Sequence, residues 1–108
     1  MTAYNLINGI HCSEHKGLIL DILRTEWKYE GLVMTDWIKS GQTYKKGNIY
    51  PASYASRNIK NGNNISMPGS KEDIKDIKNS LKEGYLSRSE LENNATVVFN
   101  FINSLKKE

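Results

Sequence analysis

Three short apolar runs alternate with stretches of helical periodicity, and this alternation limits the possible folds more than any other feature of the chain. Strands are expected near residues 1–4, 31–36 and 64–67. Helices are expected near residues 14–27, 51–61, 71–83 and 88–105. Strands that alternate with helices are typical of an α/β fold with a parallel sheet. The pattern alone fits either a partial (β/α)8 barrel or a partial open sheet.

The length of the chain decides how much of such a fold it can hold. The chain has 108 residues, whereas a complete eight-stranded barrel needs roughly 250 residues. A barrel interpretation therefore makes residues 1–108 a single fragment with about three parallel strands alternating with helices. The apolar content is 38%, so we expect a thin core.

Local signals mark several of the expected elements. Leu32-Val33-Met34 is an unbroken apolar stretch, as expected for a strand buried on both faces. Ser70 is placed to cap the third helix, which Gly84 ends. Ser87 and Glu90 have the spacing of a capping box at the start of the last helix.

Charge and cysteine content argue against several classes of protein. The net charge of +3 comes from 15 basic and 12 acidic residues without a basic cluster, so we expect no nucleic-acid binding. No segment approaches the roughly 20 apolar residues of a membrane span, so we expect no membrane insertion. Cys12 is the single cysteine and Met1–Asn5 does not resemble a signal peptide. These features favour a cytoplasmic location, with secretion through upstream sequence left open.

Asp36 is the residue with the clearest functional placement. It directly follows the expected buried strand, and in a barrel the carboxyl ends of the strands carry the active site. Trp37 beside it offers a flat apolar face that suits stacking on a sugar ring. Tyr4 ends the first expected strand and Met67 the third, so polar and aromatic groups converge from three strand ends. The same pattern also fits an aspartate that only caps a turn.

Other polar residues give weaker signals. His11, Cys12 and His15 could suggest a metal site or a thiol nucleophile, but no second ligand cluster and no orienting group follow. The glycine-containing loops lack the spacing of the nucleotide-binding motifs. We therefore expect no metal and no cofactor. Glu14 is expected to be a solvated surface carboxylate.

Several motifs resemble a known family when they are taken together. They are Met1-Thr2-Ala3-Tyr4-Asn5, Asn8-Gly9, Cys12-Ser13-Glu14, Asp21-Ile22-Leu23-Arg24-Thr25-Glu26-Trp27, Gly31-Leu32-Val33-Met34-Thr35-Asp36-Trp37 and Ile59-Lys60-Asn61-Gly62-Asn63-Asn64-Ile65-Ser66-Met67-Pro68-Gly69. In this order they resemble the family 3 glycoside hydrolases, the β-glucosidase family. The resemblance covers nearly the whole chain. Asn64 stands where that family usually has an aspartate.

The resemblance implies a fold and a set of site residues. The chain would supply strands six to eight of the family's N-terminal barrel. Asp36 would be the nucleophile, and Tyr4 and Trp37 would shape the sugar subsite. The acid/base group of such enzymes lies in a second α/β domain, and this chain has no counterpart to it. The partners would be a β-linked glycoside and the missing remainder of the barrel.

Three interpretations follow. In the first, the chain is a fragment of a retaining β-glycosidase that works through a covalent glycosyl-enzyme on Asp36 and is inactive in isolation. In the second, it is a truncated homologue that acts as a weak sugar-binding or interaction module. In the third, it is an unrelated α/β protein in which Asp36 is structural. Unpaired strand edges lead us to expect self-association of the fragment.

Overall fold

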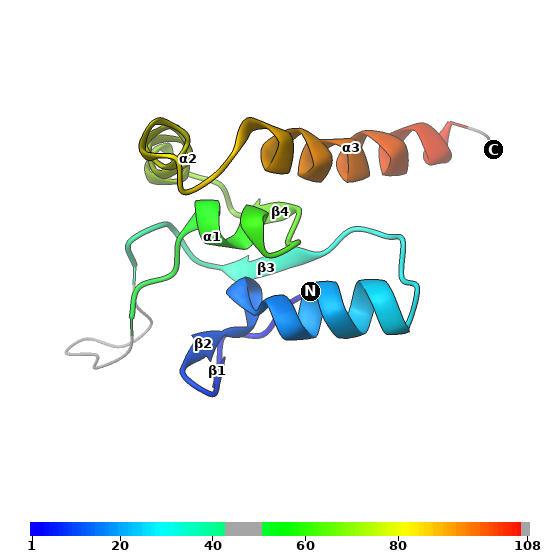
Figure 1. The fold of residues 1–108 in the computed structure, drawn as a ribbon, viewed down its shortest axis with the longest axis horizontal. Helices are drawn as coiled ribbons and strands as arrows, with labels where there is room; N and C mark the ends of the chain where they lie inside the picture. The colour runs from blue at the N-terminus through cyan, green and yellow to red at the C-terminus, as the bar shows by residue number, and fades with distance from the viewer. Residues whose placement is uncertain (43–50, 107–108) are drawn as a thin grey trace.

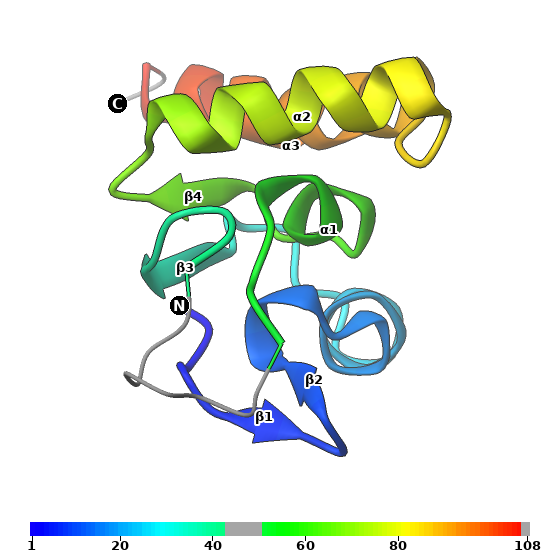
Figure 2. The ribbon, with the colours of Figure 1, turned by 90° about the vertical axis from the view of Figure 1, so that its left-hand side faces the viewer.

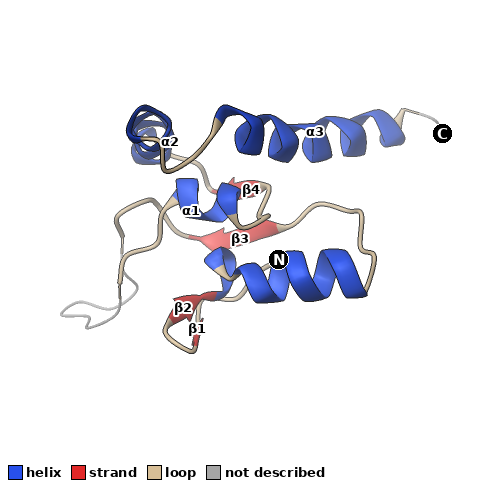
Figure 3. Ribbon diagram, viewed as in Figure 1, coloured by secondary structure: helices blue, strands red, loops and turns tan. Residues whose placement is uncertain are grey.

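The computed structural model describes residues 1–42 and 51–106 of the chain (Figure 1). Helices and short strands alternate along it, as Figure 3 shows. The elements are β1 (Leu6–Ile7), β2 (Ile10–His11), the 3₁₀ turn η1 (Cys12–Glu14), the π-helix η2 (Gly17–Glu26), β3 (Met34–Trp37), α1 (Ala55–Lys60), β4 (Ile65–Met67), α2 (Lys71–Glu83) and α3 (Arg88–Leu105). None of these described helices has both the length and the hydropathy to cross a membrane.

The described strands form two small sheets. β3 and β4 are parallel and are joined through α1, which makes a βαβ unit. β1 and β2 form a separate antiparallel hairpin. An α/β fold is therefore present, but a parallel sheet of three strands is not found among the described residues.

The expected first strand at residues 1–4 is wrong. This segment runs beside β3 and bonds it at Thr2, whose N–H donates to the carbonyl of Met34 (2.8 Å), without becoming a strand. The chain instead turns at Asn8 and Gly9, whose φ angles are 51° and 78°. Positive φ at both central residues is the geometry of a two-residue hairpin turn, for which Asn-Gly is the preferred sequence.

The layers place the parallel pair in the middle of the molecule. α2 and α3 lie on one side of β3 and β4, and η2 lies on the other (Figure 2). α1 contacts α2, α3 and η1. The most buried apolar side chains are Leu86, Ile19, Ala55 and Val33, which come from different segments of the chain.

The expected helix at residues 14–27 is shorter and of a different type. His15 has an extended backbone (φ −88°, ψ 99°) that separates η1 from η2, and its Nδ1 accepts the N–H of Leu18 (3.3 Å). η2 has π-helical bonds, such as the one from Trp27 N–H to the carbonyl of Ile22 (2.9 Å). The apolar periodicity indicates a helix here but does not separate an α-helix from a π-helix.

α1 begins at Ala55, four residues after the expected start at Pro51. The helix begins there because side chains of other segments accept hydrogen bonds from its first N–H groups. These bonds run from Tyr54 N to Glu14 Oε1 (2.7 Å), from Ala55 N to Ser40 Oγ (2.8 Å) and from Ser56 N to Asp76 Oδ2 (2.7 Å). Local preference at Pro51 is thus overridden by tertiary contacts.

The caps of α2 and α3 are confirmed. Ser70 Oγ accepts the N–H of Asp73 (3.1 Å), and Gly84 ends α2 in the left-handed conformation. Ser87 and Glu90 form both bonds of the capping box at the start of α3. These bonds join residues three positions apart, so the sequence alone determines them.

Candidate active site

Asp36 lies on β3, near the carboxyl end of the parallel pair. Its side chain is half-buried, and its Oδ1 accepts the N–H of Trp37 (2.8 Å). The next residue, Trp37, pairs with Met67, which ends β4. The carboxylate therefore occupies the edge of the sheet at which α/β enzymes place reacting groups.

Tyr4 is brought to the same place from the start of the chain. Its hydroxyl accepts the N–H of Trp37 (3.0 Å) and donates to the carbonyl of Trp37 (3.1 Å). Partial burial and then a hydrogen bond with Asp36 raise the pKa of Tyr4, while the bond from the Trp37 backbone lowers it. The phenol is therefore protonated at neutral pH and can act as a hydrogen-bond donor.

Trp37 completes this group with an open aromatic surface. Its side chain is 60% exposed, which leaves the indole face accessible to a ligand. An exposed aromatic ring beside a carboxylate can pack on the apolar face of a sugar while the carboxylate reaches the ring carbons. The structure thus gathers Tyr4, Asp36 and Trp37 in one place.

At the beginning of the parallel pair, Arg24 and Asn64 connect η2 to the residues that precede β3 and β4. Arg24 Nη2 donates to Asn64 Oδ1 (2.8 Å), which also accepts the N–H of Val33 (3.0 Å). Arg24 Nη1 donates to the carbonyls of Tyr29 (2.9 Å) and Gly31 (2.6 Å). Burial lowers the pKa of Arg24, and the neighbouring Tyr29 raises it. Asn64 supplies the acceptor oxygen at the position where an aspartate was expected.

The Arg24–Asn64 pair was not expected from the sequence to be functional. The two residues stand 40 positions apart, so no local pattern relates them. A signal was present, because both residues belong to the motifs that carry the family resemblance.

His11 and Cys12, which could suggest a metal site or a thiol nucleophile, are both buried inside the fold. His11 is buried and its Nε2 lies 2.7 Å from the carbonyl oxygen of Pro51. Cys12 is also buried, which raises the pKa of its thiol. Within residues 1–42 and 51–106, no three His, Cys, Asp or Glu side chains gather where they could hold a metal ion.

The expectation for Glu14 is wrong. Its side chain is buried, accepts the N–H of Tyr54 (2.7 Å) and lies 3.8 Å from the guanidinium of Arg57. A carboxylate that binds the first turn of a helix is stabilised by the N–H groups there. Glu14 therefore connects η1 to α1.

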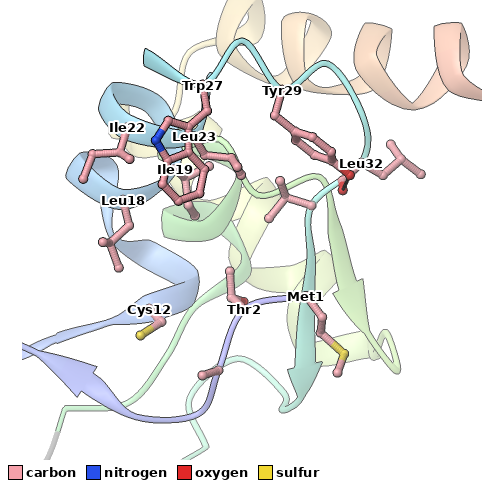
Figure 4. A pocket seen from close by; sticks show the side chains of 12 residues that line it. Met1, Thr2, Cys12, Leu18, Ile19, Ile22, Leu23, Trp27, Tyr29 and Leu32 are labelled. Carbon is pink, nitrogen blue, oxygen red and sulfur yellow. Dashed lines mark hydrogen bonds between the residues drawn. The ribbon is translucent and has the colours of Figure 1, made fainter. Parts of the chain in front are cut away.

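An apolar cavity of about 440 Å³ lies away from Asp36, beside the beginning of β3. Figure 4 shows side chains of η2 gathered on one side of it and the first residues of the chain on another. The lining residues are Met1, Thr2, Ala3, Cys12, Leu18, Ile19, Ile22, Leu23, Trp27, Tyr29, Leu32 and Val33. The lining is mostly apolar, and no Asp or Glu is among these residues.

A carboxylate and two aromatic side chains at the end of a parallel strand can bind a sugar, and comparison with known proteins identifies the class of protein. Residues 1–101 match the family described as glycosyl hydrolase family 3 N terminal domain. The chain belongs to this family.

Relatives and solved structures give the same result. The chain is 46% identical to a beta-glucosidase of Kluyveromyces marxianus over 69 residues, which are 64% of this chain and 7% of that protein. It matches beta-glucosidase 3B from Thermotoga neapolitana in complex with glucose at a TM-score of 0.68 and 34% identity, over 85% of this chain and 12% of that one. It matches a Bifidobacterium adolescentis GH3 beta-glucosidase at a TM-score of 0.69 and 30% identity, over 94% of this chain and 13% of that one. The chain thus spans a small part of each of these proteins.

Proposed function

We propose that this chain is the part of a retaining β-glucosidase-like enzyme that carries the nucleophile, and that Asp36 is that nucleophile. The observation that carries the proposal is the position of Asp36 between Tyr4 and Trp37 at the end of β3. The names of the relatives support the substrate class, a β-linked glycoside.

The reaction follows from a pair of carboxyl groups about 5–5.5 Å apart. Asp36 Oδ attacks the anomeric carbon, and the bond to the leaving oxygen breaks while an acid group protonates that oxygen. Water then attacks the anomeric carbon, the same group removes a proton from the water, and the Asp36 carboxylate is released. The acid/base group would come from a second α/β domain outside this chain.

Tyr4 and Trp37 have supporting roles in this proposal. The Tyr4 hydroxyl binds the N–H and the carbonyl of Trp37, so it holds the backbone next to Asp36 and helps to fix the direction from which the carboxylate meets the sugar. The exposed Trp37 indole packs against the sugar ring. We propose no cofactor, because the two carboxyl groups and water suffice for the chemistry.

The isolated chain is proposed to be inactive. Removal of an acid/base group alone lowers rates by about 10²–10⁴-fold, and the remaining sugar contacts would be missing too. The alternative is a weak sugar-binding or interaction module, which the exposed Trp37 indole favours. Titration of the isolated chain with glucose, followed by tryptophan fluorescence, tests the alternative.

We also expect the isolated chain to self-associate. One side of β4 and the apolar cavity beside η2 would be covered by other barrel segments in a longer enzyme, and Trp27 (71%) and Phe99 (63%) are exposed. Open strand edges and apolar surfaces favour pairing between copies. Sedimentation velocity should show oligomers that grow with concentration. A compact monomer at high concentration contradicts this expectation.

A chimaera tests the nucleophile. This chain replaces the matching segment of the Thermotoga neapolitana enzyme, and turnover of an aryl β-glucoside is measured. Asp36→Asn should lower kcat by roughly 10⁴-fold or more, as loss of a nucleophile does in other enzymes. A 2-deoxy-2-fluoroglucoside should label the peptide that contains Asp36, as detected by mass spectrometry.

The matched control is Asp21→Asn, which removes the same charge from an exposed position on η2. It should leave both turnover and labelling unchanged. Turnover of Asp36→Asn at the wild-type rate, or label on another residue, overturns the proposal.

A further inference from the structure

β3 contains one more residue than β4 between two paired positions. Met34 pairs with Ile65 and Trp37 pairs with Met67, so β3 advances three residues while β4 advances two. This is the pattern of a β-bulge, which leaves one residue outside the ladder and bends the strand. The bulge contains Thr35 and Asp36. Bulges next to active sites often redirect a side chain.

The Thr35 side chain closes this bulge. Thr35 is fully buried (0% exposed), and its Oγ1 accepts the N–H of Met67 (2.8 Å). The carbonyl of Met67 accepts the N–H of Ile38 (2.9 Å). The Thr35 side chain on β3 thus binds the Met67 amide of β4 where the bulge interrupts the backbone hydrogen bonds. Both the N–H and the carbonyl of Met67 are therefore bound to β3 or to the residue that follows it.

This contact also determines how Asp36 is presented. Thr35 and Asp36 are consecutive residues of the bulge, so a shift of the Thr35 backbone would move Asp36 with it. Asp36 Oδ1 then meets the N–H of Trp37 (2.8 Å), and Tyr4 holds the same peptide segment from outside. The carboxylate therefore lies between two anchors, Thr35 and Tyr4.

We propose that Thr35 is a positioning residue, whose hydroxyl fixes the bulge and thereby the orientation of the Asp36 carboxylate. The kinetic part of this inference rests on the proposed role of Asp36. Thr35 is not a catalytic residue, because its oxygen is buried and bound to Met67. A purely space-filling threonine would act through its shape instead. A hydrogen-bonding role and a space-filling role of Thr35 therefore predict that different substitutions lower the activity.

Thr35→Val and Thr35→Ser separate these roles. Valine keeps the shape and removes the acceptor, whereas serine keeps the acceptor and removes a methyl group. In the chimaera, Thr35→Val should lower kcat by about 10²-fold, the loss that a small misplacement of a reacting group produces. KM should change less, and the rate of labelling by the fluoroglucoside should fall in parallel with kcat. Thr35→Ser should stay within about 3-fold of wild type.

A second measurement does not depend on activity. Hydrogen exchange of the Met67 amide, followed by NMR in the 108-residue chain, should be faster in Thr35→Val and unchanged in Thr35→Ser. If a variant of the isolated chain does not fold, a crystal structure of the corresponding chimaera replaces this measurement. It should show a displaced Asp36 carboxylate in Thr35→Val alone.

The outcomes separate this inference from the proposed function. Equal harm from serine and valine, or wild-type kcat and amide exchange in Thr35→Val, overturns the positioning role while an inactive Asp36→Asn still supports the nucleophile. An active Asp36→Asn variant overturns the proposed function. Exchange of the Met67 amide and the crystal structure then still test whether Thr35 fixes the bulge.

Discussion

The site region around β3 and the helical pair α2–α3 are stabilised in different ways. Around β3, the bonds join distant residues, as between Thr35 and Met67, 32 positions apart, and between Asn63 and Thr2, 61 positions apart. In α2 and α3, the bonds at the helix starts join residues three positions apart. The site region therefore depends on the whole tertiary arrangement, whereas each helix contains its own start signals. This difference predicts unequal responses to matched substitutions.

The largest effect is expected at Arg24. Arg24→Ala removes bonds to two carbonyls and to Asn64 and leaves these acceptors without the guanidinium. Bonds to charged donors contribute about 1.5–3 kcal/mol each and are not additive, so the free energy of unfolding should fall by about 3 kcal/mol. Urea denaturation of the chain measures this change.

Arg88→Ala is the control in the helical pair. Arg88 contacts Glu92 one turn along α3 (2.6 Å), and its side chain is 89% exposed. An exposed pair of this type contributes about 0.3–0.5 kcal/mol. Equal losses for Arg24→Ala and Arg88→Ala would contradict the distinction between the two regions.

A smaller effect is expected from a pair of glycines with similar backbone angles. Gly62 precedes β4 with a φ of 95°, and Gly84 ends α2 with a φ of 81°. A Cβ at Gly62 would lie 2.5 Å from Leu20 Cδ2 and 2.9 Å from Ile19 Cγ2, while a Cβ at Gly84 meets no atom within 4 Å. Leu20 can move its terminal methyl, but Ile19 is buried.

Both Gly→Ala variants share the strain of a positive φ, about 1 kcal/mol. Gly62→Ala should lose about 1 kcal/mol more than Gly84→Ala, because the tightly packed side chain of Ile19 must shift. Urea denaturation under one set of conditions compares them. A loss at Gly84 as large as that at Gly62 would show that backbone strain alone decides both positions.

The same contrast explains what could be predicted from the sequence. The starts of α2 and α3 follow from Ser70 and Ser87, because a cap and its partner are close in the chain. The bulge at Thr35 and the contact between Arg24 and Asn64 could not be predicted, because they depend on the register of segments more than 30 positions apart. The convergence of Tyr4 with Asp36 was expected from the strand ends, although residues 1–4 do not form a strand.

One local signal was missed for a different reason. Asn8-Gly9 is a strong hairpin signal by itself, but no element was expected between residues 4 and 14, so β1 and β2 were not predicted. The π-helical bonds of η2 are a separate case, because apolar periodicity does not distinguish them from α-helical bonds.

The smallest effect is expected at Glu90, which makes the stability of the α2–α3 pair depend on pH. The N–H of Ser87 and then the ammonium of Lys60 hold the pKa of Glu90 below its ordinary value. Its contribution to stability is therefore present above the unfolded pKa of about 4.3 and is lost as the pH falls through the lower folded pKa. Solvent screening at this exposed position keeps the contribution below about 0.5 kcal/mol. Comparing urea denaturation at pH 7 and pH 3, the loss of stability on acidification should be smaller in Glu90→Gln than in wild type. Glu92→Gln removes the same charge without touching the cap, so it should lose as much stability on acidification as wild type. An identical loss in all three proteins would show that the charge of Glu90 does not measurably stabilise the capping box.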